Sequence, residues 1–434
     1  MNRYERYKDS GIPWLGEIPE HWNICRLKDE VTFNDEVLGD KTDADYEILY
    51  VDISSVSLIE GIVQKEPMSF EDSPSRARRI VKNGDVIVST VRTYLKAITQ
   101  IQDAEDNLIV STGFAVLRPK ENLFPRFLGY WVQSENMIGA IVSNSVGVSY
   151  PAINATDLVR LPIVKLPLKE QTAIAHYLDT KLGEIDALID KQQTLLEKLA
   201  EQRTAVITHA VTKGLTPAAP MKKSGVEWLG DVPAHWETWK ITHAIDLIGS
   251  GTTPKSDNAE YYDGDILWVT TSELRENFIS DTKQKVSDSA IKEYSALKIY
   301  PVNSVAMAMY GATIGRLGIL EREATFNQAC CVFGNSKILH YKFLFYWLWH
   351  RRPILISLSN GGGQPNLSQD DLRKLKIPIP SYEEQINIAE YLDQETVKID
   401  RLCETVNQTI GRLKEYRTAL ITQVVTGKIK VTDE

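Results

Sequence analysis

The 434-residue sequence contains little cysteine and little histidine, and neither is spaced as a metal site requires. Its four cysteines form no CxxC pair, and its seven histidines form no HExxH or comparable ligand spacing. The adjacent Cys330 and Cys331 lie in an apolar stretch, which favours buried, reduced thiols over a metal or disulfide site. We therefore expect neither a bound metal nor a disulfide framework.

Long hydrophobic runs are also missing. No apolar stretch approaches the roughly 20 residues that cross a bilayer. The first residues, MNRYERYKDSG, lack the apolar core of a signal peptide. The sequence thus indicates a globular protein that works in the cytoplasm.

Catalytic motifs are scarce. The phosphate-binding pattern GxxxxGK[ST] is absent, so ATP hydrolysis by this chain is not expected. The string DLIGSGTTP, residues 246–254, imitates the glycine-rich loop that holds S-adenosylmethionine in amino-methyltransferases. Those enzymes also need an Asn/Asp-Pro-Pro-aromatic motif, and the sequence has no Pro-Pro pair. We predict no catalytic residue; a methyltransferase that uses GSGTT stays as an alternative, which S-adenosylmethionine binding by the isolated chain would support.

The charge balance is acidic. There are 49 Lys and Arg against 58 Asp and Glu, a net charge of −9, which argues against a protein that coats nucleic acid. Local basic surfaces remain compatible with that balance, because recognition depends on where the charge lies. An acidic remainder also suits a subunit with protein partners, and the length predicts two or more domains.

What the sequence does contain is a long internal repeat. SGIPWLGEIPEHW, residues 10–22, returns as SGVEWLGDVPAHW, residues 224–236, with eight of thirteen positions identical. The same offset of 214 aligns EQTAIAHYLD, residues 170–179, with EQINIAEYLD. It also aligns RTAVIT, residues 203–208, with RTALIT, residues 417–422. The chain is a tandem duplication.

The middles of the two copies differ, and both show short Val, Ile, Tyr and Thr runs broken by Gly, Asp and Asn. Such runs (DVIVSTV, DILWVTT, SVAMAMY) predict strands and turns. Residues 124–134 and 341–351 predict matching helices whose aromatic side chains pack in a core. A shared frame around divergent middles suggests two copies of one scaffold with different recognition surfaces.

Each copy ends in a long helix with a coiled-coil seam, because apolar residues recur at alternating steps of four and three. The first seam comprises Leu178, Leu182, Ile185, Ile189, Gln192, Leu196, Leu199, Arg203, Val206 and Ala210. The second seam comprises Leu392, Thr396, Ile399, Cys403, Val406, Ile410, Leu413, Arg417, Leu420 and Val424. We expect the two helices to pair antiparallel as a rod of about 60 Å. The alternative is that each helix covers only its own domain.

The expected fold is therefore α+β, with two tandem α/β domains separated by two long helices in an antiparallel coiled coil of pseudo-two-fold symmetry. We place the first domain at residues 1–167 and its helix at 168–213. Residues 214–223 are a patternless linker rich in Pro and Ala. The second domain then covers residues 224–380, and the second helix covers 381–427.

Basic, aromatic and hydroxyl side chains cluster in the divergent middles. Arg reads guanine edges and clamps phosphates, while Tyr and Thr contact the backbone or thymine methyl groups. We predict that the clusters contact DNA through Arg76, Arg78, Arg79, Arg92, Tyr94, Lys96, Lys255, Thr271, Ser272, Arg275, Tyr310, Thr313 and Arg316. For any one of these residues, a solvated surface position is the competing interpretation.

Over essentially its full length the sequence resembles the specificity subunits of type I restriction-modification systems. The resemblance rests on WLGEIPEHW and WLGDVPAHW, on SGTTPKSDNAEYYDGDILWVTTSEL, and on GDVIVSTVR. It rests further on GGGQPNLSQDDLRKLKIPIPSYEEQINIAEYLD and its partner LVRLPIVKLPLKEQTAIAHYLD. The first copy lacks the SGTTP start that the second copy has.

The resemblance implies that each variable half is a target recognition domain that reads one part of a bipartite DNA site. The helices would set the spacer and dock two modification subunits, which carry S-adenosylmethionine and methylate adenine at N6. Restriction subunits would add ATP- and magnesium-dependent nuclease activity. The chain itself would be non-catalytic and would bind no cofactor directly.

Two related alternatives stay open. One is a specificity module of a methylation-only or related defence system. The other is a coiled-coil adaptor that does not bind DNA, which would explain the acidic charge and the helices but not the Arg, Tyr and Thr clusters. The sequence does not give the DNA target or the spacer length.

Overall fold

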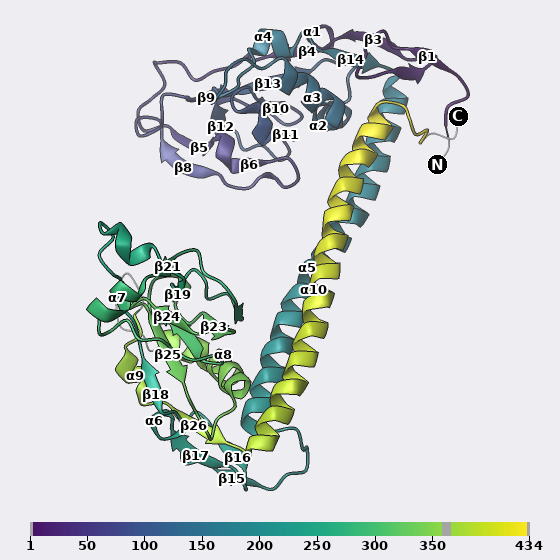
Figure 1. Cartoon of the computed structure of the whole chain (residues 1–434). Coiled ribbons are helices and arrows are strands. Elements are labelled where there is room, and N and C mark those ends of the chain that lie inside the picture. Colours follow the sequence, from purple (N-terminus) through teal and green to yellow (C-terminus); the bar gives the residue numbers. More distant parts are fainter. Residues whose placement is uncertain (1–2, 358–365, 432–434) are drawn as a thin grey trace. The chain divides into compact units, whose positions relative to one another are not determined.

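The computed structural model describes residues 3–357 and 366–431, and the chain forms two compact units (Figure 1). Unit 1 comprises Met1–Gln193 and Asn407–Glu434, and unit 2 comprises Thr194–Val406. Two long helices, α5 (Leu168–Lys213) and α10 (Tyr382–Val425), each contribute to both units.

Unit 1 contains two four-stranded sheets. The first has the order β11-β10-β13-β4, and β10 is antiparallel to both of its neighbours. The second has the order β8-β5-β12-β9, in which β12 runs parallel to β5. The strand bounds are β4 Val31–Phe33, β5 Glu47–Val51, β8 Glu66–Ser69, β9 Ala77–Ile80, β10 Val86–Ser89, β11 Ile98–Gln100, β12 Leu108–Ser111 and β13 Phe114–Pro119.

Shorter elements complete unit 1. The paired strands are β1 Tyr7–Asp9 with β2 Glu17–Pro19, β3 Asn23–Arg26 with β14 Pro162–Lys165, and β6 Val56–Ser57 with β7 Gly61–Ile62. The helices are α1 Leu27–Glu30, α2 Pro125–Gln133, α3 Glu135–Ser143 and α4 Ala155–Leu158, with 3₁₀ turns η1 Ile53–Ser55 and η2 Thr93–Leu95. Helix α2 is buried through Phe127, Tyr130 and Trp131, which confirms the helix expected at residues 124–134.

Unit 2 repeats this plan with one strand more in its first sheet, which has the order β18-β25-β22-β23-β20. A second sheet has the order β21-β19-β24, and β15 pairs with β16 and β17 with β26. The strands are β15 Met221–Lys223, β16 Asp231–Pro233, β17 Glu237–Lys240, β18 Leu247–Gly249, β19 Ile266–Val269, β20 Asn277–Ile279, β21 Lys285–Val286, β22 Val305–Ala308, β23 Leu317–Leu320, β24 Ala324–Phe326, β25 Cys330–Gly334 and β26 Lys376–Ile379. The helices are α6 Ile241–Ala244, α7 Asp288–Glu293, α8 Tyr341–Ser357 and α9 Gln369–Arg373, with η3 Ala259–Tyr262 and η4 Gly311–Thr313.

The stretch expected to be a patternless linker is partly ordered as a strand. Met221–Lys223 forms β15. This strand pairs antiparallel with β16, which lies inside the repeated tryptophan phrase. Tyr7–Asp9 forms β1 against β2 at the matching place in unit 1. The repeat therefore starts before the tryptophan phrase. The strand was not predicted because Met-Lys-Lys is exposed along its whole length and shows no apolar alternation.

Within each unit, the start of one long helix packs on the end of the other, so α5 and α10 are antiparallel. In unit 1, Leu178 and Ile185 of α5 share a core with Leu420 and Val424 of α10. In unit 2, Ala210 and Val211 share a core with Ile388 and Leu392. Each position of both expected seams is buried or half-buried. The paired coiled coil is confirmed, and the alternative of two unpaired helices is wrong.

The two arginines that interrupt the seams are paired with acids. Arg417 Nε lies 3.0 Å from Asp186 Oδ1 in unit 1. Arg203 forms the same ion pair with Asp400 in unit 2. A guanidinium is accepted in an apolar seam because a carboxylate from the facing helix pairs with it.

The repeated tryptophan phrase lies where the two long helices end and begin. In unit 1, Trp22 is buried against Gly427, which follows α10 and has a φ of +73°. In unit 2, Trp236 is buried against Gly214, which follows α5 and has a φ of +74°. A left-handed glycine is a common helix terminator, and a Cβ on Gly214 would lie 3.2 Å from the Trp236 ring. The phrase thus anchors each unit to the end of the returning helix.

Both histidines of the phrase have structural hydrogen-bonding roles. His21 Nε2 lies 3.0 Å from Glu170 Oε2, and His235 Nε2 lies 3.0 Å from Glu384 Oε2. Cys330 and Cys331 are buried in β25 as expected, whereas Cys25 and Cys403 are half-buried; all four are free. Within the described residues, no helix has the length and apolar character needed to cross a bilayer.

Candidate nucleic-acid interface

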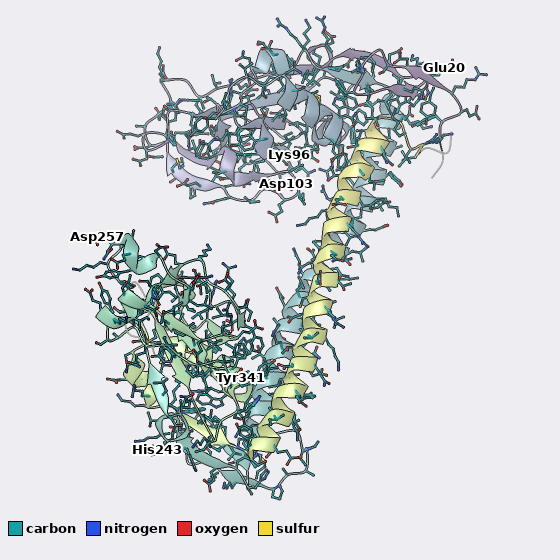
Figure 2. All side chains as sticks on the ribbon, in the orientation of Figure 1. Glu20, Lys96, Asp103, His243, Asp257 and Tyr341 are labelled. Atoms are coloured by element: carbon teal, nitrogen blue, oxygen red, sulfur yellow. The ribbon has the colours of Figure 1, made fainter. Side chains whose placement is uncertain are left out.

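In unit 1, three of the predicted contact residues surround one exposed turn. The 3₁₀ turn η2 follows β10, and Arg92, Tyr94 and Lys96 are all exposed there (Lys96 is labelled in Figure 2). Arg92 and Lys96 flank the turn in the left-handed conformation, with φ values of 51° and 55°. Non-glycine residues with positive φ are uncommon and need support from their surroundings. The turn therefore presents two cations and an aromatic ring on a constrained backbone.

Support for η2 comes from the segment after α3. Arg92 N donates to Pro151 O at 2.8 Å, and the Arg92 guanidinium lies 4.7 Å from the Tyr150 ring centroid. Stacking on an aromatic face leaves the N–H groups at the edge of a guanidinium free to bind acceptors. Tyr150 was not among the contact residues predicted from the sequence.

Arg76 lies on the same edge of unit 1 as η2. Its carbonyl accepts from Thr112 N at 2.8 Å, and Gly113 O of that turn accepts from Thr90 N at 2.8 Å. Its side chain contacts Asp52, with Nη2 3.0 Å from Oδ2, and Nε donates to the Tyr50 hydroxyl at 3.1 Å. The turn at Thr112 and Gly113 thus links the backbone of Arg76 to that of Thr90, two residues before Arg92.

Arg78 and Arg79 do not lie together. They are neighbours on β9, and successive side chains of a strand face opposite sides. The Arg78 guanidinium packs over the Phe70 ring at 4.5 Å. Arg79 Nε is buried and has no hydrogen-bond partner within the described residues, and this burial lowers the pKa of Arg79. We rank both below Arg76 and Arg92, because Arg78 packs over Phe70 and Arg79 Nε is buried.

In unit 2, three loops meet at the turn that follows β24. Gly251 N donates to Asn327 O, Asn327 N donates to Val269 O at 2.9 Å, and Met309 N donates to Ala329 O at 2.8 Å. The ends of the loops that precede η3, follow β19 and follow β22 are thereby joined. This junction carries six of the residues predicted from the sequence to contact DNA: Thr271, Ser272 and Arg275 on one loop and Tyr310, Thr313 and Arg316 on another.

The η4 turn of unit 2 matches η2 of unit 1. Both follow the central strand of the first sheet, β22 or β10, and both precede its neighbour, β23 or β11. Tyr310 bridges to Asn366, just as Val91 bridges to Ala152. The two copies therefore present different side chains from one position of the fold.

An ion pair between two half-buried side chains lies next to the η4 turn. Arg352 Nη2 of α8 is 2.8 Å from Glu276 Oε1, and the Glu276 backbone has a φ of 60°. Burial raises the pKa of Glu276, whereas the Arg352 guanidinium beside it favours the ionised carboxylate. A Cβ on Gly315 would lie 2.6 Å from the Arg352 side chain, so this pair and the turn are closely packed. The pairing of Glu276 with Arg352 was not predicted from the sequence, because the two residues are 76 positions apart in the chain.

The glycine-rich string that imitates a cofactor loop has a packing explanation. A Cβ on Gly251 would lie 1.6 Å from Phe326 O, so only glycine allows this approach of two backbones. Thr253 Oγ1 donates to Gln328 Oε1 at 2.7 Å, and Trp268 Nε1 donates to Thr252 O. These contacts thus hold the string in the loop junction. Lys255 next to it is exposed, and its backbone N donates to the Tyr294 hydroxyl.

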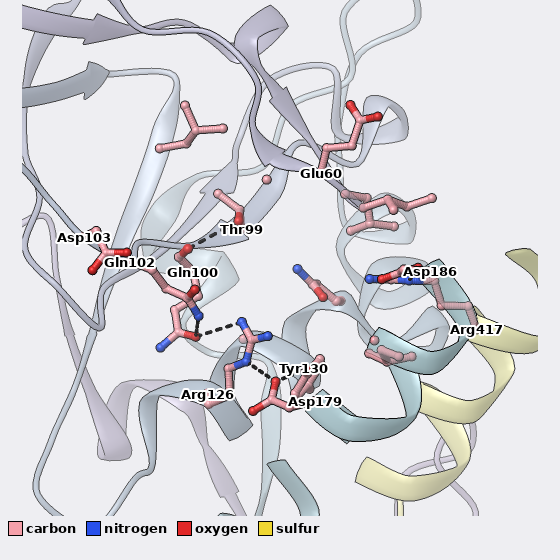
Figure 3. Close-up of a pocket in the computed structure, with 18 of the residues that line it drawn as sticks. Glu60, Thr99, Gln100, Gln102, Asp103, Arg126, Tyr130, Asp179, Asp186 and Arg417 are labelled. Carbon is pink, nitrogen blue, oxygen red and sulfur yellow. Dashed lines mark hydrogen bonds and ion pairs between the residues drawn. The ribbon is translucent and has the colours of Figure 1, made fainter. Parts of the chain in front are cut away.

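Each unit is fastened to a long helix by an aspartate that binds a tyrosine and a cation. In unit 1, Asp179 Oδ1 accepts from Arg126 Nε at 2.6 Å and from the Tyr130 hydroxyl at 2.5 Å (Figure 3). In unit 2, Asp393 accepts from Lys342 Nζ at 2.5 Å and from the Tyr346 hydroxyl at 2.7 Å. The pKa of each tyrosine is raised, chiefly by burial, which keeps the hydroxyl a donor.

A buried glutamine repeats the attachment about two turns earlier on each helix. Gln171 Oε1 accepts from Phe124 N at 2.8 Å, and its amide donates to Leu166 O and Asn122 O. Gln385 makes the same three bonds to His340 N, Pro380 O and Ile338 O. These contacts explain why the Glu-Gln pair recurs in both copies.

A polar cavity of about 630 Å³ lies beside the Asp179 contact in unit 1 (Figure 3). Its lining includes Lys65, Glu105, Arg126, Asp179 and Arg417. These charges are paired with one another or with neighbours, as in Lys65 with Glu105 at 2.6 Å. Within the described residues, no group of three His, Cys, Asp or Glu side chains could hold a metal ion. We therefore assign the cavity no ligand.

Comparison with known proteins agrees with this geometry. The family model for the type I restriction modification DNA specificity domain matches twice, at residues 20–198 and 233–412. A putative type I restriction enzyme specificity subunit of Methanocaldococcus jannaschii is 25% identical over 96% of both chains. The specificity subunit of a second type I enzyme of that organism is 24% identical over 95% of this chain and 94% of its own.

Solved structures share the fold. A chain from a type I restriction-modification system, studied for its assembly and conformational transition, superposes with a TM-score of 0.76 and 22% identity. That match covers 95% of this chain and 99% of the other. The HsdS subunit of Thermoanaerobacter tengcongensis gives a TM-score of 0.57 and 22% identity over 95% of this chain and 98% of its own. Two family domains that cover most of the sequence, each with a loop edge rich in Arg, Tyr and Thr, identify the chain as a member of the type I restriction-modification specificity subunits.

Proposed function

We propose that the η2 edge of unit 1 and the η4 edge of unit 2 each read one half of a bipartite DNA site. The observation that carries this proposal is the matched position of the two turns. The same fold position presents Arg92, Tyr94 and Lys96 in one copy and Tyr310, Thr313 and Arg316 in the other. The frame contacts are repeated while the reading residues differ, as expected of two domains with different base preferences.

The first test is an exchange of one recognition segment. Residues 221–376 are replaced by the matching segment of another family member, and adenine methylation is sequenced in cells that contain the modification subunits. We expect one half-site of the methylated motif to change and the other to stay. A change in both half-sites would contradict the assignment of one half-site to each unit.

We further propose that the long helices set the spacer. One heptad is inserted into each helix at facing positions, after Gln193 in α5 and after Val406 in α10, which keeps the seam in register. Seven residues add about 10.5 Å of helix, close to three base-pair steps of 3.4 Å. The expected motif keeps both half-sites and gains about three base pairs between them. Altered half-site sequences would contradict the spacer role.

The partners that we propose are two modification subunits, one for each repeat. Leu188 of α5 and Leu402 of α10 occupy equivalent positions of the duplication, and they are 46% and 52% exposed. Exposed leucines at equivalent positions favour docking of two identical subunits. We expect Leu188→Asp or Leu402→Asp to leave one modification subunit bound in native mass spectrometry, and the double variant to leave none. Two subunits retained by the double variant would contradict this docking surface.

We propose that the partner subunits carry out the catalytic steps. This chain would recognise DNA in the cytoplasm without being catalytic itself. The modification subunits would carry S-adenosylmethionine and methylate adenine N6, and restriction subunits would use ATP and magnesium. A gel shift of the assembled complex across salt concentrations separates this proposal from an adaptor without DNA contact. Phosphate contacts predict a steep loss of affinity with salt; a flat profile would favour the adaptor.

A further inference from the structure

One loop of unit 1 exposes apolar side chains that the proposed reading edge does not explain. Between α3 and Ala152, Val146 is 81% exposed, Val148 is 101% exposed and Tyr150 is 62% exposed. Side chains this apolar and this exposed are unusual so close together, and such groups mark contact sites. The residues lie on a loop tip and not on a helix or sheet face.

The loop is held in place by hydrogen bonds. Val146 N donates to Ala152 O at 2.8 Å, and Ala152 N donates to Val146 O at 3.0 Å, which closes a narrow hairpin. Gly147, directly after Val146, has a φ of +113°, a conformation open to glycine. Ser145 Oγ lies 2.9 Å from Thr93 Oγ1 of η2. Val146 and Val148 therefore project from a loop whose ends are held by hydrogen bonds.

The loop is held against η2, the same turn that we propose reads DNA. Arg92 stacks over Tyr150 at 4.7 Å, and Arg92 N donates to Pro151 O. Tyr94 and Leu95 of η2 are also exposed, with Lys96 beside them. An apolar tip flanked by cations and aromatic rings fits a nucleic acid better than a purely apolar protein surface, because the cations suit phosphates while the apolar groups suit base faces.

We propose that the Val146–Tyr150 loop is a wedge that inserts its apolar side chains between base steps of the first half-site. This inference rests on the proposed function of the η2 edge. Unstacking a step lets the duplex bend toward the protein and lowers the barrier to extruding an adjacent base. Stacked on Arg92, Tyr150 would position the wedge relative to the phosphate contacts.

The second copy differs in sequence at this loop. At the constant offset of 214, Val146, Val148 and Tyr150 align with Asn360, Gly362 and Gln364, whereas the glycine between the valines is kept as Gly361. Those aligned residues lie outside the described part of the chain. The apolar character belongs to the first copy, so base unstacking is expected in one half-site and not in both.

The experiment uses the assembled complex with its modification subunits. The probe is a duplex that carries the bipartite motif read by methylation sequencing, and thymine oxidation by permanganate reports unstacked bases. Val146→Ser with Val148→Ser removes the apolar tip without touching the core. Val63→Ser is the matched control, since Val63 is a 51% exposed valine on another part of unit 1.

We expect hyper-reactive thymines in the first half-site with the wild-type complex and with Val63→Ser. The double serine variant should lose that reactivity and bind about tenfold more weakly, which is the effect of a lost unstacking contact worth about 1.4 kcal/mol. A mismatched base pair at the reactive step should restore most of the lost affinity, because the mismatch has already weakened the stack.

Each other outcome overturns the wedge. Unchanged reactivity and affinity in the double serine variant would show that the loop does not enter the duplex. Weaker capture of a modification subunit, with DNA binding intact, would assign the loop to protein docking. The double variant Arg92→Ala with Lys96→Ala tests the reading edge separately from the wedge. If that variant loses affinity while the serine variant does not, only the wedge fails; if neither changes binding, the reading edge itself is wrong.

Discussion

Unit 1 and unit 2 keep the same contacts where each joins the long helices and differ where each meets solvent at its loop edge. Asp179 and Asp393 bind a tyrosine and a cation, and Gln171 and Gln385 make three equivalent bonds. By contrast, unit 1 has the full strand β9 next to β12, where unit 2 has a single bridge from Tyr300 to Ala324. Unit 2 instead adds β20 to its first sheet.

This difference separates two kinds of constraint within one duplicated scaffold. The attachment glutamines Gln171 and Gln385 are buried and hydrogen-bonded to backbone from several elements, so a change at one of them leaves several groups unpaired. Edge residues face solvent and stabilise the fold little, so they can change without loss of the fold. Matched substitutions in the two units test this separation directly.

The largest expected effect is at the buried tryptophans. Trp22→Ala and Trp236→Ala should each lower the free energy of unfolding by about 3–5 kcal/mol, because each removes a large side chain from a core. The phenylalanine variants sharpen the comparison. Trp236 Nε1 donates to Glu384 at 3.0 Å, whereas Trp22 Nε1 has no partner within the described residues.

Trp236→Phe should therefore cost about 1 kcal/mol more than Trp22→Phe, the net contribution of one hydrogen bond. Urea denaturation of the full chain measures both. Equal costs for the two phenylalanine variants would contradict the difference in hydrogen bonding.

A second comparison concerns the glutamines of the attachment. Gln171→Ala and Gln385→Ala each leave one backbone N–H and two carbonyls without their partner in a buried site. We expect each to cost about 2–3 kcal/mol. Gln192→Ala, at a half-buried position of the same helix, is the control and should cost under about 1 kcal/mol. A large loss for one glutamine alone would show that the attachments are not equivalent.

Acid stability should differ between the units because of His350. Burial lowers the pKa of His350 to about 4, and its Nδ1 lies 2.9 Å from Thr208 Oγ1. In the unfolded chain this histidine takes up a proton near pH 6.5. As pH falls from about 6.5 to 4, protonation favours the unfolded state, and unit 2 should lose about 2 kcal/mol through this group.

His350→Asn should flatten that part of the stability profile, which urea denaturation at several pH values measures. Unit 1 places Glu135 N against Thr422 Oγ1 at the matching contact, and it has no histidine there. An unchanged pH slope in the variant would show that another group causes the acid sensitivity.

The smallest effects should come from the seam ion pairs. The Arg417 side chain is 10% exposed and that of Arg203 is 30% exposed. Asp186→Ala leaves the more buried arginine unpaired and should cost about 1–2 kcal/mol, whereas Asp400→Ala should cost under about 1 kcal/mol. Thermal unfolding of the two variants decides the order. The reverse order would mean that exposure does not control the strength of these pairs.

The frame was predictable from the sequence because its signals are local or periodic. The heptads fixed the helices and their pairing, and the buried helix α2 and strand β10 followed from apolar spacing. Contacts between distant residues left no such signal. The Glu276–Arg352 pair and the loop junction at Asn327 depend on how the loops fold over the sheet. The predicted edge residues Arg92 and Tyr310 lie at matching turns, while Arg79 is directed elsewhere by strand alternation.

The way unit 1 is assembled has a consequence for synthesis on the ribosome. Unit 2 is one continuous stretch of chain, but unit 1 combines Met1–Gln193 with Asn407–Glu434, which is translated after all of unit 2. Until that part emerges, the nascent α5 lacks the Leu420 and Val424 side chains that cover Leu178 and Ile185. Translation of unit 1 therefore begins before that of unit 2 and is completed after it, and a chain that stops within α10 leaves unit 1 without its second segment.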